Sequence, residues 1–396
     1  MILTPESKVT VDLSVQKDGD EYTVGSSITG TFIRVPYEAV AIIELLDGTN
    51  TIEEITTQLQ KREIDVDVSE FVTDLKEIGL VAEIDGEACE EAENTSVPFN
   101  ENVKRLGMVF YNPITIPLYV ILSLSCIGLF IYKPALLPSY EDMFVFESMG
   151  LSLLVLFVLS WGLTILHEIG HYLAAVRLGI PVTFRLSLRL YWLVVEADMT
   201  GLWSIPKNQR YIPYLGGMFF DGIMLFIALI VQLSNPAFYP QLMELTAFIL
   251  VFRFGWHCLI FLRTDLYYIL MNMINVPGLH DYAKLFLKER LGINHGEIPL
   301  REQLNQVERN YVQVFTGLYA IGASIAILLF VFYSAPGFYT VATNTFHQIS
   351  QNELNSFYFW DGLLIVTISI VNGLLWLKGA RTKYNFMKDK RSVQVD

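Results

Sequence analysis

Long runs of apolar residues constrain the fold of this chain more than any other feature of its sequence. A helix needs about 20 predominantly apolar residues to cross the hydrocarbon core of a bilayer. Six windows approach or exceed that length: Ile114–Tyr132, Leu151–Ala175, Ile212–Leu233, Leu245–Leu262, Val312–Tyr333 and Gly362–Leu377. We therefore expect a multi-pass α-helical membrane protein with about six transmembrane helices, in contact with a lipid bilayer.

Charge is distributed unevenly along the chain, whose formal net charge is −14. The first 105 residues hold 23 acidic and 8 basic side chains, whereas the remaining residues hold 18 and 19. An acidic soluble head thus precedes a nearly neutral, apolar body. A head of this charge argues against a nucleic-acid partner. Only Cys89, Cys126 and Cys258 are present, too few for a disulfide framework or a cysteine-based zinc site.

The segments between the windows alternate in their content of basic residues. Segments 133–150, 234–244 and 334–361 hold one lysine among them, whereas segments 177–210, 284–309 and 378–391 are rich in lysine and arginine. Because cytoplasmic loops carry the excess of positive charge, this pattern places both termini in the cytoplasm and the chain in the cell membrane. The first 20 residues lack the basic start and apolar core of a signal peptide, which agrees with a cytosolic head.

The sequence His167-Glu168-Ile169-Gly170-His171 lies inside the second apolar window. On a helix, residues four positions apart lie on one face, so both imidazoles can share one zinc ion. The glutamate beside the first histidine can then act as the general base toward a water on the metal. Ionisable groups are costly within a bilayer, which favours zinc hydrolysis over a structural histidine pair or an inactive relic.

A catalytic zinc needs a third protein ligand and an open position. The residues themselves leave three candidates in other apolar windows: His257, Asp265 and Asp221. Asp265 closes the fourth window, where a carboxylate can equally be a solvated interfacial charge. Asp221 lies near the start of the third window, where it can instead favour a helix N-terminus. A lone histidine such as His257 is more often a hydrogen-bonded packing residue.

The loop at 179–211 has the alternation of strands. Val182-Thr-Phe-Arg-Leu-Ser-Leu-Arg-Leu repeats with a period of two, and Tyr191-Trp-Leu-Val-Val-Glu-Ala-Asp follows directly. This pattern predicts a hairpin against the membrane face, just after the histidine helix. Its free edge can hold an extended peptide by backbone pairing. The alternative is a plain loop anchored at the interface by Trp192 and Trp203.

The head is predicted to be a small α/β unit. Short strands are expected at Tyr22-Thr-Val and from Gly30 to Val35, followed by a helix that Pro36 opens. Asp47-Gly48 is expected to form a turn, after which Thr51 and Glu54 form a capping box for a second helix. A third helix is expected at about Val68–Ile78, ended by Gly79, with a return strand from Leu80 to Ile84.

The metal motif, the hairpin-like loop, Gly216-Gly217 at the start of the third window and Asp265 at the end of the fourth together resemble the site-2 protease family of membrane zinc metallopeptidases. The resemblance covers about Leu151 to Leu287. In that family the third zinc ligand is the aspartate of an LDG-type motif, which aligns with Arg263-Thr-Asp265-Leu-Tyr-Tyr. The chain departs from the family by Leu266 in place of glycine, and its GP-x-x-N element is altered to Gly216-Gly-Met-Phe-Phe-Asp221.

This resemblance implies one Zn²⁺ per chain, held by His167, His171 and Asp265, with Glu168 as the catalytic base. Asp221 and His257 then become candidates for contacts to a ligand or to substrate. The departures place the chain in a divergent branch that resembles the peptide-maturation metalloproteases of bacteria.

The head also resembles a known family. The segment from Pro36 to Ile55, followed by Phe71 and Leu75-Lys-Glu-Ile-Gly-Leu80, is similar to PqqD-like domains. The resemblance implies a winged-helix-like fold that binds the leader of a peptide as an added strand, here beside Gly30–Val35. A generic regulatory or assembly domain is the alternative for the same pattern.

We therefore expect a PqqD-like cytosolic domain at 1–87, an acidic linker at 88–110, a six-span metallopeptidase domain at 111–378 and a basic cytosolic tail at 379–396. The expected function is zinc-dependent endoproteolysis of a peptide or membrane-protein substrate, in maturation of a ribosomally made peptide. Two alternatives stay open. One is regulated intramembrane proteolysis of a signalling protein, and the other is a non-catalytic membrane export partner that binds peptides.

Overall fold

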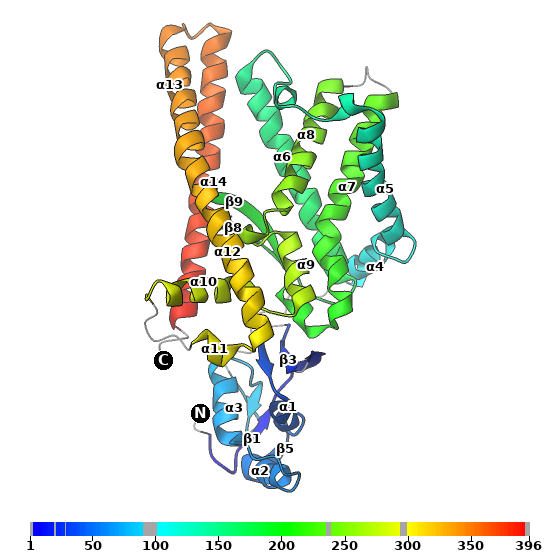
Figure 1. Cartoon of the computed structure of the whole chain (residues 1–396), viewed down its shortest axis with the longest axis vertical. Coiled ribbons are helices and arrows are strands. Elements are labelled where there is room, and N and C mark those ends of the chain that lie inside the picture. Colours follow the sequence, from blue (N-terminus) through cyan, green and yellow to red (C-terminus); the bar gives the residue numbers. More distant parts are fainter. Residues whose placement is uncertain are drawn as a thin grey trace.

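The computed structural model describes residues 3–19, 21–27, 29–89, 101–234, 239–293 and 299–392, the last seven of them by backbone alone. A small head of short strands and helices lies at one end of the molecule, and long helices rise from it (Figure 1). The last helix, α14 (Phe357–Ser392), runs back to the end where the head lies.

Two small antiparallel sheets form the framework of the head. One is a meander of three strands, β2 (Ser14–Asp18), β3 (Glu21–Ser26) and β4 (Thr31–Val35). The other has the order β5-β1-β6-β7, with β1 (Lys8–Thr10), β5 (Asp47–Thr51), β6 (Glu83–Ile84) and β7 (Glu87–Ala88). The predicted strands at 22–24 and 30–35 are confirmed. The predicted turn at Asp47-Gly48 is instead part of β5, with Gly48 at a φ of +79°, and the predicted return strand is confined to β6.

Three helices cover these sheets: α1 (Tyr37–Ile43), α2 (Ile52–Gln60) and α3 (Val68–Glu77). The predicted capping box is confirmed, since Glu54 N–H donates to Thr51 Oγ1 and the Glu54 carboxylate accepts from Thr51 N–H. Apolar residues from all three helices and both sheets form one buried core, which includes Val9, Val24, Ile42, Ile55, Val72 and Leu75. The head therefore has a core of its own.

The body consists mainly of helices. Their bounds are α4 (Glu101–Phe110), α5 (Thr115–Tyr132), α6 (Met149–Val176), α7 (Tyr211–Ser234), α8 (Pro240–His257), α9 (Asp265–Ile274), α10 (Leu279–Arg290), α11 (Leu300–Gln303), α12 (Gln306–Leu329) and α13 (Ala335–Gln351). α5, α6, α7 and α8 form a bundle around an apolar core with Leu163, Leu229 and Leu250. α4 occupies the end of the stretch predicted to be a linker and packs on α6; residues 90–100 of that stretch lie outside the described residues.

Five helical segments of the described chain are long and apolar enough to cross a membrane: Thr115–Tyr132, Met149–Val176, Lys207–Ser234, Gln306–Gln351 and Phe357–Asn385. They coincide with five of the six predicted windows. α8 covers the remaining window, Leu245–Leu262, only as far as His257, and Glu244 and Arg253 lower its hydropathy. The helical membrane character is thus supported, and the sixth span stays a prediction.

The predicted fifth window continues beyond its expected end. α12 passes through a π-helical turn, η7 (Phe330–Ser334), directly into α13, so most of segment 334–361 is helical. Pro336 explains the turn, because it has no N–H for the usual bond to the fourth preceding residue and its ring would clash there. The alternation of basic residues could not show this continuation, since it reports charge and not backbone conformation.

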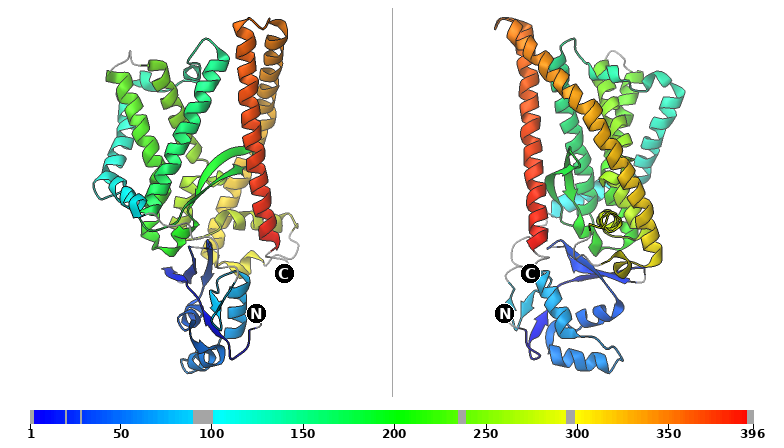
Figure 2. Two further views of the ribbon diagram at one scale, coloured as in Figure 1. Left: turned by 180° about the vertical axis from the view of Figure 1, so that it is seen from behind. Right: turned by 60° about the vertical axis from the view of Figure 1, so that its left-hand side comes forward.

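The predicted hairpin is confirmed. β8 (Thr183–Arg189) pairs antiparallel with β9 (Trp192–Asp198), in a register that runs from Thr183 opposite Asp198 to Arg189 opposite Trp192. The hairpin lies between α6 and α14, where β9 contacts α6 and β8 contacts α14 (Figure 2). This position brings β9 alongside the helix that carries the metal motif.

The head is joined to the body by polar contacts from the β2–β4 sheet. Asp18 accepts a hydrogen bond from Arg210 at 2.8 Å, and both side chains are at most 2% exposed. Arg34 donates to the Asn275 carbonyl at 2.8 Å and to Glu308 at 2.9 Å. These partners lie just before α7, just after α9 and in the first turn of α12. The head therefore contacts the ends of α7, α9 and α12, and of these α7 and α9 also contribute residues to the site described below.

Replacing Asp18 by Ala is expected to destabilise the folded protein by about 3–5 kcal/mol, because Arg210 would be left as a buried charge without its carboxylate. Denaturant unfolding in detergent, followed by tryptophan fluorescence, measures this difference. Glu21→Ala is the matched control on the same sheet, since Glu21 is 51% exposed and its pair with Arg34 is worth about 0–1 kcal/mol. Equal effects of the two substitutions would contradict a stabilising role for the buried pair.

Candidate metal centre

The two motif histidines lie one turn apart on α6, as the sequence predicts. His167 Nε2 and His171 Nε2 are 3.1 Å apart, and both residues are at most 5% exposed. The rings meet nearly at right angles, at an interplanar angle of 77°. Both Nε2 atoms therefore point toward one common position.

Asp265 completes this arrangement from another helix. Its Oδ2 atom lies 3.2 Å from His167 Nε2 and 3.2 Å from His171 Nε2. A short 3₁₀ turn, η6 (Ile260–Leu262), follows α8, and Arg263 then adopts a left-handed φ of +59° that starts α9 at Asp265. Of the three third-ligand candidates, Asp265 is the residue that meets both Nε2 atoms, so the two histidines and Asp265 form a group that could hold a metal ion.

Hydrogen bonds behind each histidine determine which nitrogen faces this group. His171 Nδ1 lies 2.8 Å from the Pro213 carbonyl oxygen, which can only accept, so Nδ1 carries the proton. His167 Nδ1 is likewise 2.8 Å from Asp221 Oδ2. In neutral rings the two Nε2 atoms then present lone pairs toward each other and toward the Asp265 carboxylate. Three electron-rich atoms this close together are stabilised by a cation between them.

The spacing of the three atoms fits a tetrahedral metal. Ligands held at about 2.0–2.1 Å from a tetrahedral ion lie about 3.3–3.4 Å from one another. The observed separations of 3.1 Å and 3.2 Å are close to that edge length. The residues present thus fit a metal bound by two imidazoles and one carboxylate, with a fourth position left for another ligand.

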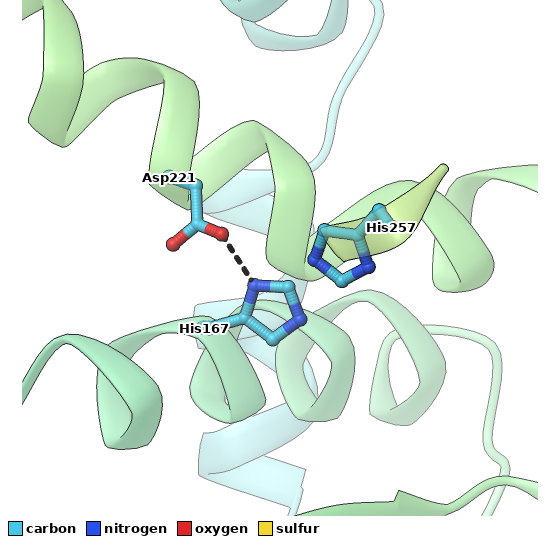
Figure 3. A group of neighbouring side chains, drawn as sticks. All are labelled: His167, Asp221 and His257. Carbon is cyan, nitrogen blue, oxygen red and sulfur yellow. Dashed lines mark hydrogen bonds and ion pairs between the residues drawn. The ribbon is translucent and has the colours of Figure 1, made fainter. Parts of the chain in front are cut away.

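Asp221 forms a second group with His167 and His257, which Figure 3 shows. Its Oδ1 accepts from Arg253 Nη1 at 2.9 Å while its Oδ2 holds His167. Arg253 is fixed in turn by the Leu163 carbonyl and by Thr164. A guanidinium so close to Asp221 opposes a metal cation at this second position. Asp221 therefore orients the His167 ring, which is the contact that a histidine needs if it is to bind a metal.

Small residues allow α6 and α7 to approach closely at the site. A Cβ atom on Gly217 would lie 2.5 Å from Cε1 of the His167 ring, and one on Gly216 would lie 2.6 Å from the Gly170 carbonyl oxygen. The hydroxyl of Tyr111 lies 3.0 Å from the carbonyl oxygens of both Gly170 and Gly216, and so bridges the two helices. This close contact sets the distance between α6, which carries the histidines, and α7, which carries their hydrogen-bond partners Pro213 and Asp221.

Glu168 lies beside the group within a cavity of about 440 Å³. Its carboxylate is 8% exposed and accepts a hydrogen bond from Ala197 N–H of β9 at 2.8 Å. His167, His171, Asp265 and His257 line the same cavity. A carboxylate able to act as a general base, a group that could hold a metal ion and space for a ligand therefore occur together.

The edge of β9 faces this cavity. Ala197 directs its N–H away from β8 and toward Glu168. Because alternate residues of a strand direct their backbone groups to the same side, Leu193 and Val195 also turn theirs away from β8. Leu193, Val195 and Ala197 line the cavity, so this edge is placed to pair with an extended peptide.

All six residues singled out from the sequence lie around one cavity or in direct contact with its walls. Tyr111 and Arg253 were missed, because their roles depend on contacts with carbonyl and carboxylate oxygens from other helices. An arginine within a predicted apolar window was the one signal available for Arg253. Comparisons of the chain with family models, with curated proteins and with solved structures find no match.

Proposed function

We propose that this protein is a membrane-embedded zinc metalloendopeptidase of the site-2 protease type. The observation that carries the proposal is the convergence of His167 Nε2, His171 Nε2 and Asp265 Oδ2, with the Glu168 carboxylate in the same cavity. Two imidazoles, one carboxylate and an open position are the ligand set of catalytic zinc sites. Burial of these groups in the interior of apolar helices also favours a functional role.

His167, His171 and Asp265 would hold the zinc ion in this proposal. Zinc supplies Lewis-acid catalysis and makes a bound water acidic enough to lose a proton near neutral pH. Asp221 and the Pro213 carbonyl keep the two imidazoles in the tautomer that ligation requires. The Arg253 guanidinium keeps Asp221 in place as an acceptor.

Glu168 would move the proton during hydrolysis. Its carboxylate accepts a proton from the attacking water, and the water oxygen bonds to the carbonyl carbon of the peptide. Glu168 then delivers that proton to the departing amine as the C–N bond breaks. Its hydrogen bond to Ala197 N–H aims the carboxylate into the cavity.

The substrate would bind as an extended strand at the edge of β9. Backbone pairing with Val195 and Ala197 would position a peptide bond next to Glu168. Ala197 N–H is engaged by Glu168, so an incoming carbonyl that takes this donor would free the carboxylate for catalysis. The mode selects substrates that can be unfolded locally, such as peptides or the ends of membrane helices.

The head would select peptides by their leader, as its resemblance to PqqD-like domains implies. β4 is an edge strand of the β2–β4 sheet in the part of the chain that the structure describes, and an added strand would pair with its second side. We place the head and the C-terminal tail in the cytoplasm, because the segments rich in lysine and arginine, 177–210, 284–309 and 378–391, are expected on that side of the membrane. Together these features favour maturation of a ribosomally made peptide as the role of the protease.

Purified protein in liposomes is expected to cleave members of a proteome-derived peptide library at defined bonds, read by mass spectrometry. A zinc chelator should abolish cleavage, and added Zn²⁺ should restore it, because the base alone cannot replace the metal. His347→Ala, at an exposed histidine outside the site, serves as the control and should cleave normally. Cleavage that survives chelation would exclude the zinc mechanism, and binding without cleavage would favour the peptide-binding export partner.

A further inference from the structure

His257 lies beside the proposed metal ligands but is not one of them, because the converging atoms belong to His167, His171 and Asp265. It is the last residue of α8, and its ring stacks on the His167 ring at 5.2 Å with an interplanar angle of 12° (Figure 3). Its carbonyl oxygen accepts from Thr264 Oγ1 at 2.7 Å, next to Asp265 in the chain. The imidazole therefore lies at the wall of the cavity, stacked on the ring of His167.

Both ring nitrogens of His257 lack a hydrogen-bond partner among the described residues, although the side chain is only 6% exposed. The nearest anion, Asp265 Oδ2, is 3.6 Å from Nδ1, which is beyond hydrogen-bond distance. Burying an imidazole without partners costs free energy, and such groups are rare in folded proteins. The missing partner is explained if it enters the cavity from outside.

Peptide hydrolysis creates a need for one further donor at this place. As the water oxygen bonds to the carbonyl carbon, the electron pair of the C=O bond moves to oxygen, and a placed N–H group stabilises that charge. Two neighbouring donors already have partners: Arg253 is bound to Asp221 and Thr164, and Ala197 N–H is bound to Glu168 and would pair with the backbone of an extended substrate in the proposed binding mode. His257 has an N–H to give in its neutral form.

We propose that His257 is a further catalytic residue, which donates an N–H hydrogen bond to the carbonyl oxygen of the scissile peptide as negative charge develops there. This inference rests on the proposed proteolytic function. His257 keeps its proton throughout, and the proton that the water loses goes to Glu168 and then to the amine. His257 thus acts on the transition state and neither binds the metal nor transfers a proton.

The test compares His257→Ala and His257→Gln with wild type, using a peptide found by the library experiment. Zinc content should stay at the wild-type level and KM should change less than about threefold, while kcat falls about 10²- to 10³-fold in His257→Ala. The affinity for a phosphinic analogue of the same peptide, which has a tetrahedral centre, should fall with kcat, whereas the affinity for an uncleaved ground-state analogue should not. His257→Gln keeps an N–H donor and should recover part of both losses.

His347→Ala is the matched histidine control and should leave every one of these values unchanged. Loss of zinc in His257→Ala would overturn the proposal by making His257 a ligand or a support of Asp265. A phosphinic analogue that binds His257→Ala as tightly as wild type would overturn it as well. Failure of the proteolytic function can be distinguished from failure of the His257 proposal, because in the first case the wild-type protein itself would show neither zinc nor cleavage.

Discussion

Glu168→Gln is expected to retain zinc and to lose peptide cleavage, with kcat about 10²- to 10⁴-fold below wild type. The glutamine side chain has nearly the same size and can still accept from Ala197 N–H, so the hairpin contact should persist. It cannot take a proton from water, which removes the base from the cavity. Initial rates on a peptide identified from the library, measured beside the zinc content, give both numbers.

The matched control is Glu302→Gln, at an exposed glutamate of α11 that is not among the residues lining the cavity. It should have wild-type rates and wild-type zinc. A Glu168→Gln protein that cleaves normally would remove Glu168 from the mechanism. One that loses zinc would show that Glu168 supports the metal instead of moving a proton.

Gly217→Ala is expected to weaken zinc binding about 10- to 100-fold. The new Cβ would lie 2.5 Å from Cε1 of His167, and this ring is fixed by Asp221 on one side and by the stacked His257 on another. Overpacking of this kind costs about 1–3 kcal/mol. Because the clash displaces the His167 ring, a proposed zinc ligand, the free energy should be lost from metal binding. Zinc titration against a chelating dye measures this loss.

Gly162→Ala is the control that separates weaker zinc binding from a general effect of a glycine-to-alanine change on helix stability or folding. Gly162 lies within α6, the apolar helix that carries His167, but a Cβ atom there would meet no atom within 4 Å among the neighbours described. Its zinc affinity should match wild type. Equal zinc affinities in the two alanine variants would contradict the close approach of α7 to His167.

The parts of the fold that the sequence predicts are those governed by local rules. The capping box of Thr51 and Glu54 depends on residues three positions apart, and the spacing of His167 and His171 depends on one turn of helix. The β8–β9 hairpin follows from a period of two in hydrophobicity. Each of these patterns can be recognised without knowledge of the partner elements.

The parts that sequence reasoning could not reach depend on contacts between distant elements. From the residues alone Asp265 was one of three candidates, and the resemblance to a family was needed to prefer it. Its contact with both Nε2 atoms depends on how α9 is placed relative to α6. The pairing of Asp221 with His167 joins residues 54 positions apart. Tyr111 lies near a segment predicted to be a linker, and nothing local indicates that its hydroxyl bridges two helices.

The metal content of purified wild-type protein tests the central claim most directly. Protein extracted in mild detergent without chelators, or reloaded with Zn²⁺ and dialysed, should contain one zinc per chain by mass spectrometry of the metals. A cation bound between the two Nε2 atoms and Asp265 Oδ2 would satisfy all three at once, and their separations suit one. Protein that retains no zinc under both conditions would contradict the metal centre and the proteolytic function built on it.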